Sequence, residues 1–175
     1  MSFADRGERF RASFDYIQRM VESSPSFANS HGTPGGGLDM LPKPVAGKLP
    51  LLITGGSQQD SDWIAKNGDG WMLYPRGAEQ QSGIIAEWRE RIAADGTPDR
   101  PVMEPLYVDL ADDPDAPPQP IHLGLRLGTN HLRHYLQTRQ AIGVNHVALN
   151  LRFNRADIKT TLKHLADEIL PDFRA

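Results

Sequence analysis

The sequence of 175 residues contains no cysteine, which excludes disulfides, thiolate metal ligands and a cysteine nucleophile. It has no apolar run near the roughly 18 residues that a membrane span requires, and its charged first ten residues do not resemble a secretory signal. Its net charge of −3 provides no basic excess for nucleic acid or an anionic membrane. We therefore expect a cytoplasmic protein with neither nucleic acid nor a membrane as partner.

What the sequence does contain is the composition of an ordinary globular domain, with 39% hydrophobic and 23% charged residues. We expect residues 1–175 to form a single domain, which is long enough to bury a sizeable core. Residues 23–50 are dense in Ser, Pro and Gly, and we predict a long loop over 23–48 because this stretch has too few apolar side chains for a core element. Loops of this length are usually functional or disordered, and both interpretations stay open.

Apolar periodicity predicts one helix followed by four strand-then-helix units. The first helix, over residues 5–21, carries Phe10, Phe14, Ile17 and Val21 on one face. The predicted strands cover 49–54, 71–74, 106–110 and 146–151, and the helices that follow them lie at 58–67, around 84–92, at 130–142 and at 156–170. The acidic, proline-rich stretch 112–120 is predicted to be a loop.

This alternation favours an α/β protein with an all-parallel sheet and right-handed crossovers. Two architectures accommodate it, namely an open doubly wound sheet and part of a (β/α)8 TIM barrel. Periodicity alone does not choose between them. A complete barrel needs about 250 residues, which is more than this chain has.

Four segments, taken in order, resemble the luciferase-like monooxygenases, also called the bacterial luciferase family. They are residues 5–10, Lys43-Pro44 followed by Pro-Leu-Leu-Ile-Thr-Gly-Gly-Ser at 50–57, Trp-Ile-Ala at 63–65 leading to Gly-Asp-Gly-Trp at 68–71, and Gly-Val-Asn-His-Val-Ala-Leu-Asn at 143–150. The resemblance covers nearly the whole chain. It implies a partial TIM barrel, with four consecutive parallel βα units preceded by one helix and with the family's first four strands upstream of Asp5.

A half barrel would expose two strand edges and the apolar inner wall of its sheet. Leaving several hundred Å² of such surface in water costs several kcal/mol at roughly 25 cal/mol per Å². That cost is comparable to the stability of a whole domain. We therefore expect the chain to form a homo-oligomer or to pair with a complementary half-barrel.

The resemblance implies a flavin-dependent monooxygenase or oxidoreductase that uses FMN, or a deazaflavin coenzyme instead, on a small-molecule substrate. By resemblance, Gly55, Gly56, Ser57 and Gln58 hold the cofactor phosphate. Independently, this loop ends a predicted strand and opens a predicted helix, whose N–H groups and dipole favour an anion. A tight turn capped by Ser57 is the alternative. The loop lacks the lysine of a P-loop, which argues against a nucleoside triphosphatase.

Two further groups end predicted strands, where barrel enzymes carry their chemistry. Tyr74 and Arg76 are predicted to face the flavin ring or its anionic side chain, and a packed Tyr beside a solvated Arg is the alternative. Asp109, Asn150 and Arg152 are predicted to orient the substrate, and an Asp109–Arg152 ion pair would explain them equally well.

The histidines carry no clear signal. His131 and His134 lie three apart on one predicted helix and would bind a metal only with a third ligand, so we predict no metal site. We expect His146 to be a core histidine bonded to a neighbour. No catalytic residue is assigned, because the resemblance implies that much of the substrate pocket comes from the upstream strands.

Two other functions fit the same residues. One is a non-catalytic half-barrel that self-associates, and the other is a small α/β module that binds a phosphorylated ligand at Gly55–Gln58.

Overall fold

The computed structural model describes residues 5–33 and 39–173. The chain divides into two compact units, Met1–Asp69 and Gly70–Ala175. None of the described helices combines the length and the apolar character that a membrane crossing requires. The expectation of a single domain stays a prediction.

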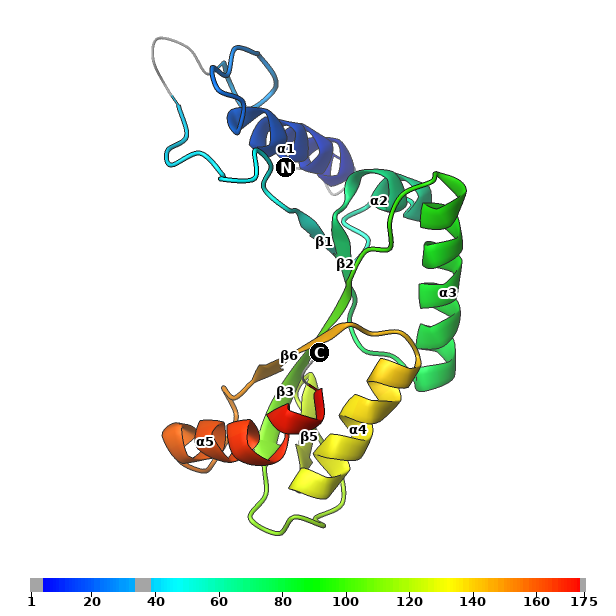
Figure 1. Cartoon of the computed structure of the whole chain (residues 1–175), viewed down its shortest axis with the longest axis vertical. Coiled ribbons are helices and arrows are strands. Elements are labelled where there is room, and N and C mark those ends of the chain that lie inside the picture. Colours follow the sequence, from blue (N-terminus) through cyan, green and yellow to red (C-terminus); the bar gives the residue numbers. More distant parts are fainter. Residues whose placement is uncertain (1–4, 34–38, 174–175) are drawn as a thin grey trace. The chain divides into compact units, whose positions relative to one another are not determined.

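The first unit contains the helices α1 (Arg6–Met20) and α2 (Ser61–Asn67) and the short strand β1 (Leu52–Thr54) (Figure 1). Aromatic side chains join the two helices, since the Trp63 ring lies edge-on to Phe10 and Phe14 at centroid distances of 5.9 and 5.3 Å. Phe14 is buried, as the spacing of apolar residues in this helix predicts.

The described residues of the 23–48 stretch form no helix or strand, and the bridge between Asn29 and Gly32 is isolated. Residues 34–38 of this predicted loop lie outside the described residues. Lys43 attaches the stretch to the end of α1, because its ammonium group donates to the carbonyls of Met20 (3.0 Å) and Glu22 (2.6 Å).

The second unit is a sheet with helices against it. Its elements are β2 (Gly70–Met72), α3 (Ala78–Ala94), β3 (Val102–Leu110), β4 (Gln119–Ile121), β5 (Gly124–Leu127), α4 (Thr129–Ala141), β6 (His146–Asn150), α5 (Ile158–Glu168) and the 3-10 helix η1 (Leu170–Phe173). The α/β class and the parallel strands are thereby confirmed.

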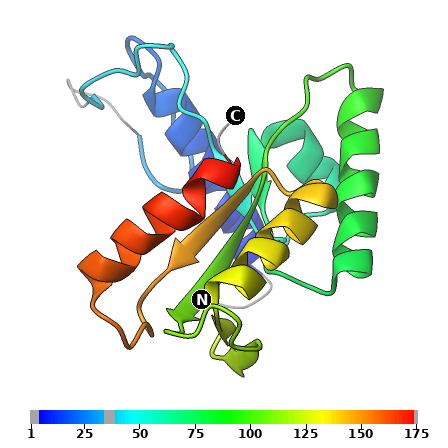
Figure 2. The ribbon, with the colours of Figure 1, turned by 60° about the horizontal axis from the view of Figure 1, so that its bottom comes forward.

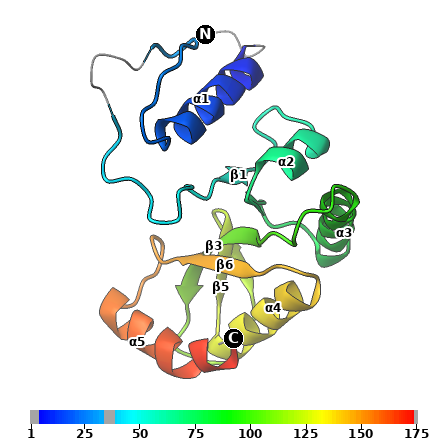
Figure 3. The ribbon, with the colours of Figure 1, turned by 45° about the horizontal axis from the view of Figure 1, so that its top comes forward.

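Strand β3 is the centre of this unit because it pairs in parallel with three others. Its beginning pairs with β2, its end pairs with β5, and β6 pairs with its residues 103–107. Helices α4 and α5 cover one face of β3 and β6 (Figures 2 and 3). A buried cluster forms on that face from Leu106, Val108 and Leu110 of β3, Leu127 of β5, Leu132 and Leu136 of α4, and Leu165 and Ile169 of the α5 segment.

The prediction of an all-parallel sheet is wrong in one place. An antiparallel hairpin, β4–β5, lies between β3 and α4, and β4 begins inside the predicted 112–120 loop. The two strands have only three and four residues, and Pro120 lies within the first. Local strand propensity therefore does not predict either strand. The hairpin forms because β5 pairs with the distant strand β3.

Strand β3 also begins at Val102, four residues earlier than predicted. The sequence hides this start because Glu104 and Pro105 are poor strand formers. In the structure Glu104 is fully buried and its charge is paired with Arg139. Pro105 stands opposite Ala148 of β6.

Candidate functional site

Residues 55–58 form a tight turn directly after β1. Gly55, Ser57 and Gln58 have positive φ angles of 58°, 47° and 56°, a region that non-glycine residues seldom occupy. The Ser57 hydroxyl donates to the Thr54 carbonyl at 2.9 Å, and the Gln59 N–H donates to the Gly56 carbonyl at 2.7 Å. The tight turn proposed as the alternative for this loop is therefore present.

The helix after this turn begins later than predicted. Helix α2 starts at Ser61 rather than at Gln58, and its N-cap is Asp60, whose carboxylate accepts the Trp63 N–H at 2.6 Å. Ser57 does not cap the helix. The Asp60 side chain already satisfies a donor of this seven-residue helix and adds a negative charge there, so the helix itself offers little to an anion.

The turn supplies donors of its own. The backbone N–H groups of Gly56, Ser57 and Gln58 have no acceptor within the described part of the chain. Three successive N–H groups in a turn with left-handed residues can form a concave donor set for an anion. An alanine side chain at Gly55 would meet no atom within 4 Å, so space lies beside the turn. An anion bound here would therefore be held by the N–H groups of the turn and not by the helix dipole.

Tyr74 and Arg76 follow β2 in the second unit. Tyr74 is 56% exposed rather than packed, whereas the solvated arginine of the alternative agrees with the exposed Arg76. The Arg76 guanidinium is exposed and donates at 3.4 Å to the Tyr74 carbonyl. The Arg139 guanidinium of α4 donates at 3.0 Å to the Arg76 carbonyl. This bond fixes the backbone of the loop after β2.

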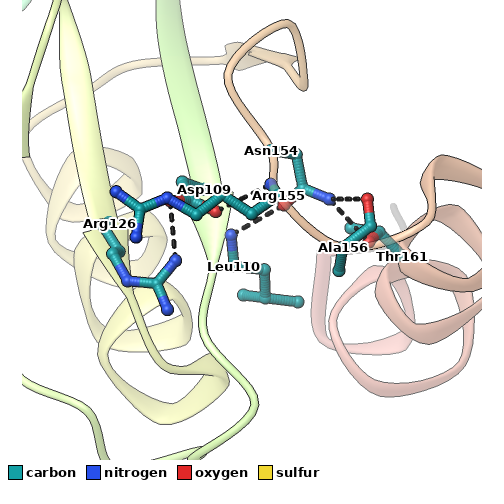
Figure 4. A network of polar contacts seen from close by, with 7 residues as sticks. All are labelled: Asp109, Leu110, Arg126, Asn154, Arg155, Ala156 and Thr161. Carbon is teal, nitrogen blue, oxygen red and sulfur yellow. Dashed lines mark hydrogen bonds and ion pairs between the residues drawn. The ribbon is translucent and has the colours of Figure 1, made fainter.

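Asp109, near the end of β3, is at the centre of a polar network (Figure 4). Its carboxylate accepts from the Arg126 guanidinium at 2.7 Å and from the Arg155 backbone N–H at 3.0 Å. The Arg155 guanidinium lies 3.2 Å away. Asp109 is only 1% exposed, and these two arginines compensate for the burial of its charge.

Asn154 closes the same network from the loop after β6. Its amide oxygen accepts the Leu110 N–H at 2.9 Å, and its amide nitrogen donates at 2.9 Å to the Ala156 carbonyl and to the Thr161 hydroxyl (Figure 4). One side chain thereby joins the end of β3, the loop and the first turn of α5.

The predicted ion pair between Asp109 and Arg152 is wrong, since the partners of Asp109 are Arg126 and Arg155. Arg152 instead lies over the Phe153 ring, 5.7 Å from its centroid. Asn150, the last residue of β6, accepts the Arg152 N–H with its side chain at 2.9 Å. Asn150 therefore shapes the loop that presents Arg152.

Sequence reasoning missed Arg126, Asn154 and Arg155. Arg126 lies in the hairpin strand that was not predicted. Asn154 and Arg155 lie in the loop after the fourth predicted strand, where barrel enzymes carry functional groups, so their position was a usable signal.

An aromatic cluster lies beside the network. The ring of Tyr107 is 5.1 Å from that of Phe153 and 6.4 Å from that of His122, and the rings of His122 and Phe153 are 5.9 Å apart. Tyr107 and Asp109 share a face of β3 because they are two residues apart. Leu106, Val108 and Leu110 face the helices on the opposite side.

One of the histidine expectations is contradicted. His146 is exposed, so the expectation of a core histidine is wrong. Strand β6 pairs only with β3 among the described strands, which leaves this residue on an open edge. The described residues contain no group of three or more His, Cys, Asp or Glu side chains that could hold a metal.

Asp157, which caps α5 next to the network, has a displaced pKa. The backbone N–H and the hydroxyl of Thr160 both donate to its carboxylate, and these bonds hold the pKa of Asp157 below its usual value of 3.8.

The family model described as "Luciferase-like monooxygenase" matches residues 1–173. No curated protein gives a significant match.

Solved structures share the fold at low identity. The monooxygenase RslO1 from Streptomyces bottropensis matches with a TM-score of 0.77 and 15% identity, over 99% of this chain and 64% of its own. An F420-dependent secondary alcohol dehydrogenase, solved with an F420–acetone adduct, matches with a TM-score of 0.71 and 14% identity, over 100% of this chain and 64% of its own. EDTA monooxygenase from Chelativorans sp. BNC1 gives 0.67 and 11%, over 99% and 62%. The chain thus spans less than two thirds of each of these proteins.

Proposed function

Because the chain belongs to the luciferase-like monooxygenase family, we propose that it is a flavin-dependent monooxygenase or oxidoreductase acting on a small molecule. The match over residues 1–173 is the observation that carries this proposal. One structural neighbour is described as F420-dependent, so the cofactor is either FMN or a deazaflavin coenzyme. The cofactor supplies the redox chemistry, and the protein supplies binding, orientation and shielding from water.

The turn of Gly55, Gly56, Ser57 and Gln58 is the proposed binding site for the cofactor phosphate. Its support is the set of three N–H groups without a described acceptor and the open space beside Gly55. Tyr74 and Arg76 stay the predicted contacts of the flavin ring or of its anionic side chain. The exposed Tyr74 ring and the loop fixed by Arg139 are compatible with that role.

We further propose that the working protein contains more βα units than this chain, supplied by a second copy or by a complementary half-barrel. Support comes from β6, which pairs on one side only among the described strands. Beside it lies an apolar hollow of about 470 Å³. Leu162 and Leu170, which line the hollow, are 54% and 49% exposed. A strand added to this edge would bury them.

Titration of the purified chain with FMN and, separately, with F420 tests the cofactor proposal, with calorimetry and the absorption spectrum of the bound cofactor as readouts. We expect one of the two to bind with a micromolar or lower Kd. A chain that binds neither would overturn the proposal.

Light scattering after size-exclusion chromatography tests the proposed association with a second copy or a complementary half-barrel. A monodisperse, well-folded monomer would contradict that association.

A further inference from the structure

Three arginines, Arg126, Arg152 and Arg155, lie in or just after strands β5 and β6, and two of them share one carboxylate. Arg126 and Arg155 both bind Asp109, at 2.7 and 3.2 Å. Arg152 belongs to the same loop as Arg155 and pairs with no carboxylate of the described residues. Asp109 therefore pairs with two arginines, and the loop after β6 carries the further charge of Arg152.

The acidic loop after β3 does not supply the missing partners. The Asp113 carboxylate accepts the Asp115 N–H at 3.0 Å, and the Asp115 carboxylate accepts from the Asn130 amide at 2.7 Å. Asp157 caps α5 through Thr160. These carboxylates bind within their own loops or helix ends.

The exposed arginines keep donors for a ligand. A guanidinium carries five N–H donors, and the Arg155 side chain directs its Nε toward Asp109 while 74% of it remains exposed. Arg152 is exposed and lies over Phe153. Both side chains can therefore present terminal N–H groups to an anion, in the fork that suits carboxylate, sulfonate or phosphate oxygens.

An apolar surface adjoins these donors. Phe153, which is 38% exposed, contacts both Tyr107 and His122. Arg152 and Phe153 are neighbours in the chain and in space, so a charged group and a ring are presented side by side. This pairing is suited to a molecule that has an anionic end and an apolar or aromatic body.

We propose, resting on the function proposed above, that the substrate of this site is an organic anion. Arg152 and Arg155 bind its carboxylate, sulfonate or phosphate group, and Phe153 and Tyr107 contact its apolar body. Asp109 holds Arg126 and Arg155 in place, and Asn150 shapes the loop that carries Arg152.

The phosphate of a cofactor has the same chemistry as such a substrate, so the experiment must separate the two. Benzoate serves as the anionic probe, and benzamide is its neutral counterpart of nearly the same shape. FMN and F420 are titrated in parallel. Calorimetry gives the Kd of each probe for the wild-type chain, for R155M and for the double variant R152M/R155M.

The variants are chosen to preserve the fold. In R155M the backbone N–H of residue 155 still binds Asp109, and Arg126 remains as its ion-pair partner. R155K retains the charge without the planar fork. R91M is the control, because Arg91 lies on α3 and pairs there with Glu87, which is 64% exposed. Circular dichroism verifies that each variant is folded.

We expect wild-type chain to bind benzoate at least about tenfold more tightly than benzamide, since hydrogen bonds to a charged group contribute that much or more. The preference should weaken in R155M, disappear in R152M/R155M, and persist in R91M. Added salt should weaken benzoate binding and leave benzamide binding unchanged.

Equal affinities for benzoate and benzamide, or an unchanged preference in the double variant, would overturn the proposal. A double variant that loses FMN or F420 affinity but keeps its benzoate affinity would also overturn it, by assigning the arginines to the cofactor. If the wild type binds neither cofactor yet prefers benzoate through these arginines, the anion site is supported and the proposed redox function fails.

Discussion

The Arg139 guanidinium binds the Glu104 carboxylate through two parallel hydrogen bonds, of 2.7 Å from Nε and 2.6 Å from Nη2, with both side chains buried. The pair joins the last turn of α4 to the first half of β3. A third N–H group of Arg139 donates to the carbonyl of Arg76. The loop that carries Tyr74 and Arg76 therefore depends on the same side chain.

Removing one member of this pair should destabilise the chain strongly. R139M leaves the Glu104 carboxylate buried without its ion-pair partner. We expect the free energy of unfolding to fall by about 3–5 kcal/mol. Urea denaturation followed by circular dichroism measures the change. The double variant R139M/E104M should recover most of the loss, because it buries no charge. A single variant as stable as the wild type would contradict the assignment.

The control is R91M, which removes the ion pair between the half-buried Arg91 and the exposed Glu87 of α3. Glu87 is 64% exposed in that pair, so we expect a change of about 1 kcal/mol or less. A loss in R91M as large as in R139M would mean that burial is not the cause.

Gly124 is predicted to be irreplaceable in the hairpin that the sequence did not reveal. A Cβ at this position would lie 1.9 Å from the Tyr107 carbonyl oxygen, so G124A must push β5 away from β3. We expect the free energy of unfolding, measured by urea denaturation, to fall by about 1–3 kcal/mol. The opposite sign is expected for G83A in the interior of α3, where nothing lies within 4 Å and alanine favours the helix by about 1 kcal/mol.

The turn after β1 gives a prediction for cofactor binding. G55A forces alanine into φ +58° and should disturb the donor set of residues 56–58, so its affinity for FMN or F420 should fall. G47A is the control, since Gly47 also has a positive φ of +68° and open space around it. Equal cofactor affinities in the two variants, measured by calorimetry, would remove the turn from the site.

Asp157 should contribute to the stability of α5 in a pH-dependent way. Because the folded pKa is below the usual 3.8, its contribution is fully present above that value and is lost as the pH falls through the lower folded pKa. D157N keeps a capping oxygen without titrating. The melting temperature of the wild type should therefore fall more steeply below about pH 4 than that of D157N. Parallel curves for the two proteins would contradict this role.

The sequence by itself determined the order of helices and parallel strands, because apolar spacing records which face of each element is buried. The stripe of α4 with Leu132 and Leu136 and the core residues of β3 follow from that periodicity. The family likeness also came from local motifs, such as residues 50–57 and 143–150.

Only the tertiary structure decided the β4–β5 hairpin, the early start of β3 and the partners of Asp109. Each depends on contacts between residues far apart in the chain: Gly124 against Tyr107, Glu104 with Arg139, and Asp109 with Arg126 and Arg155. Local propensity cannot record a charge that is neutralised by a distant side chain, or a strand that is stable only because another one pairs with it.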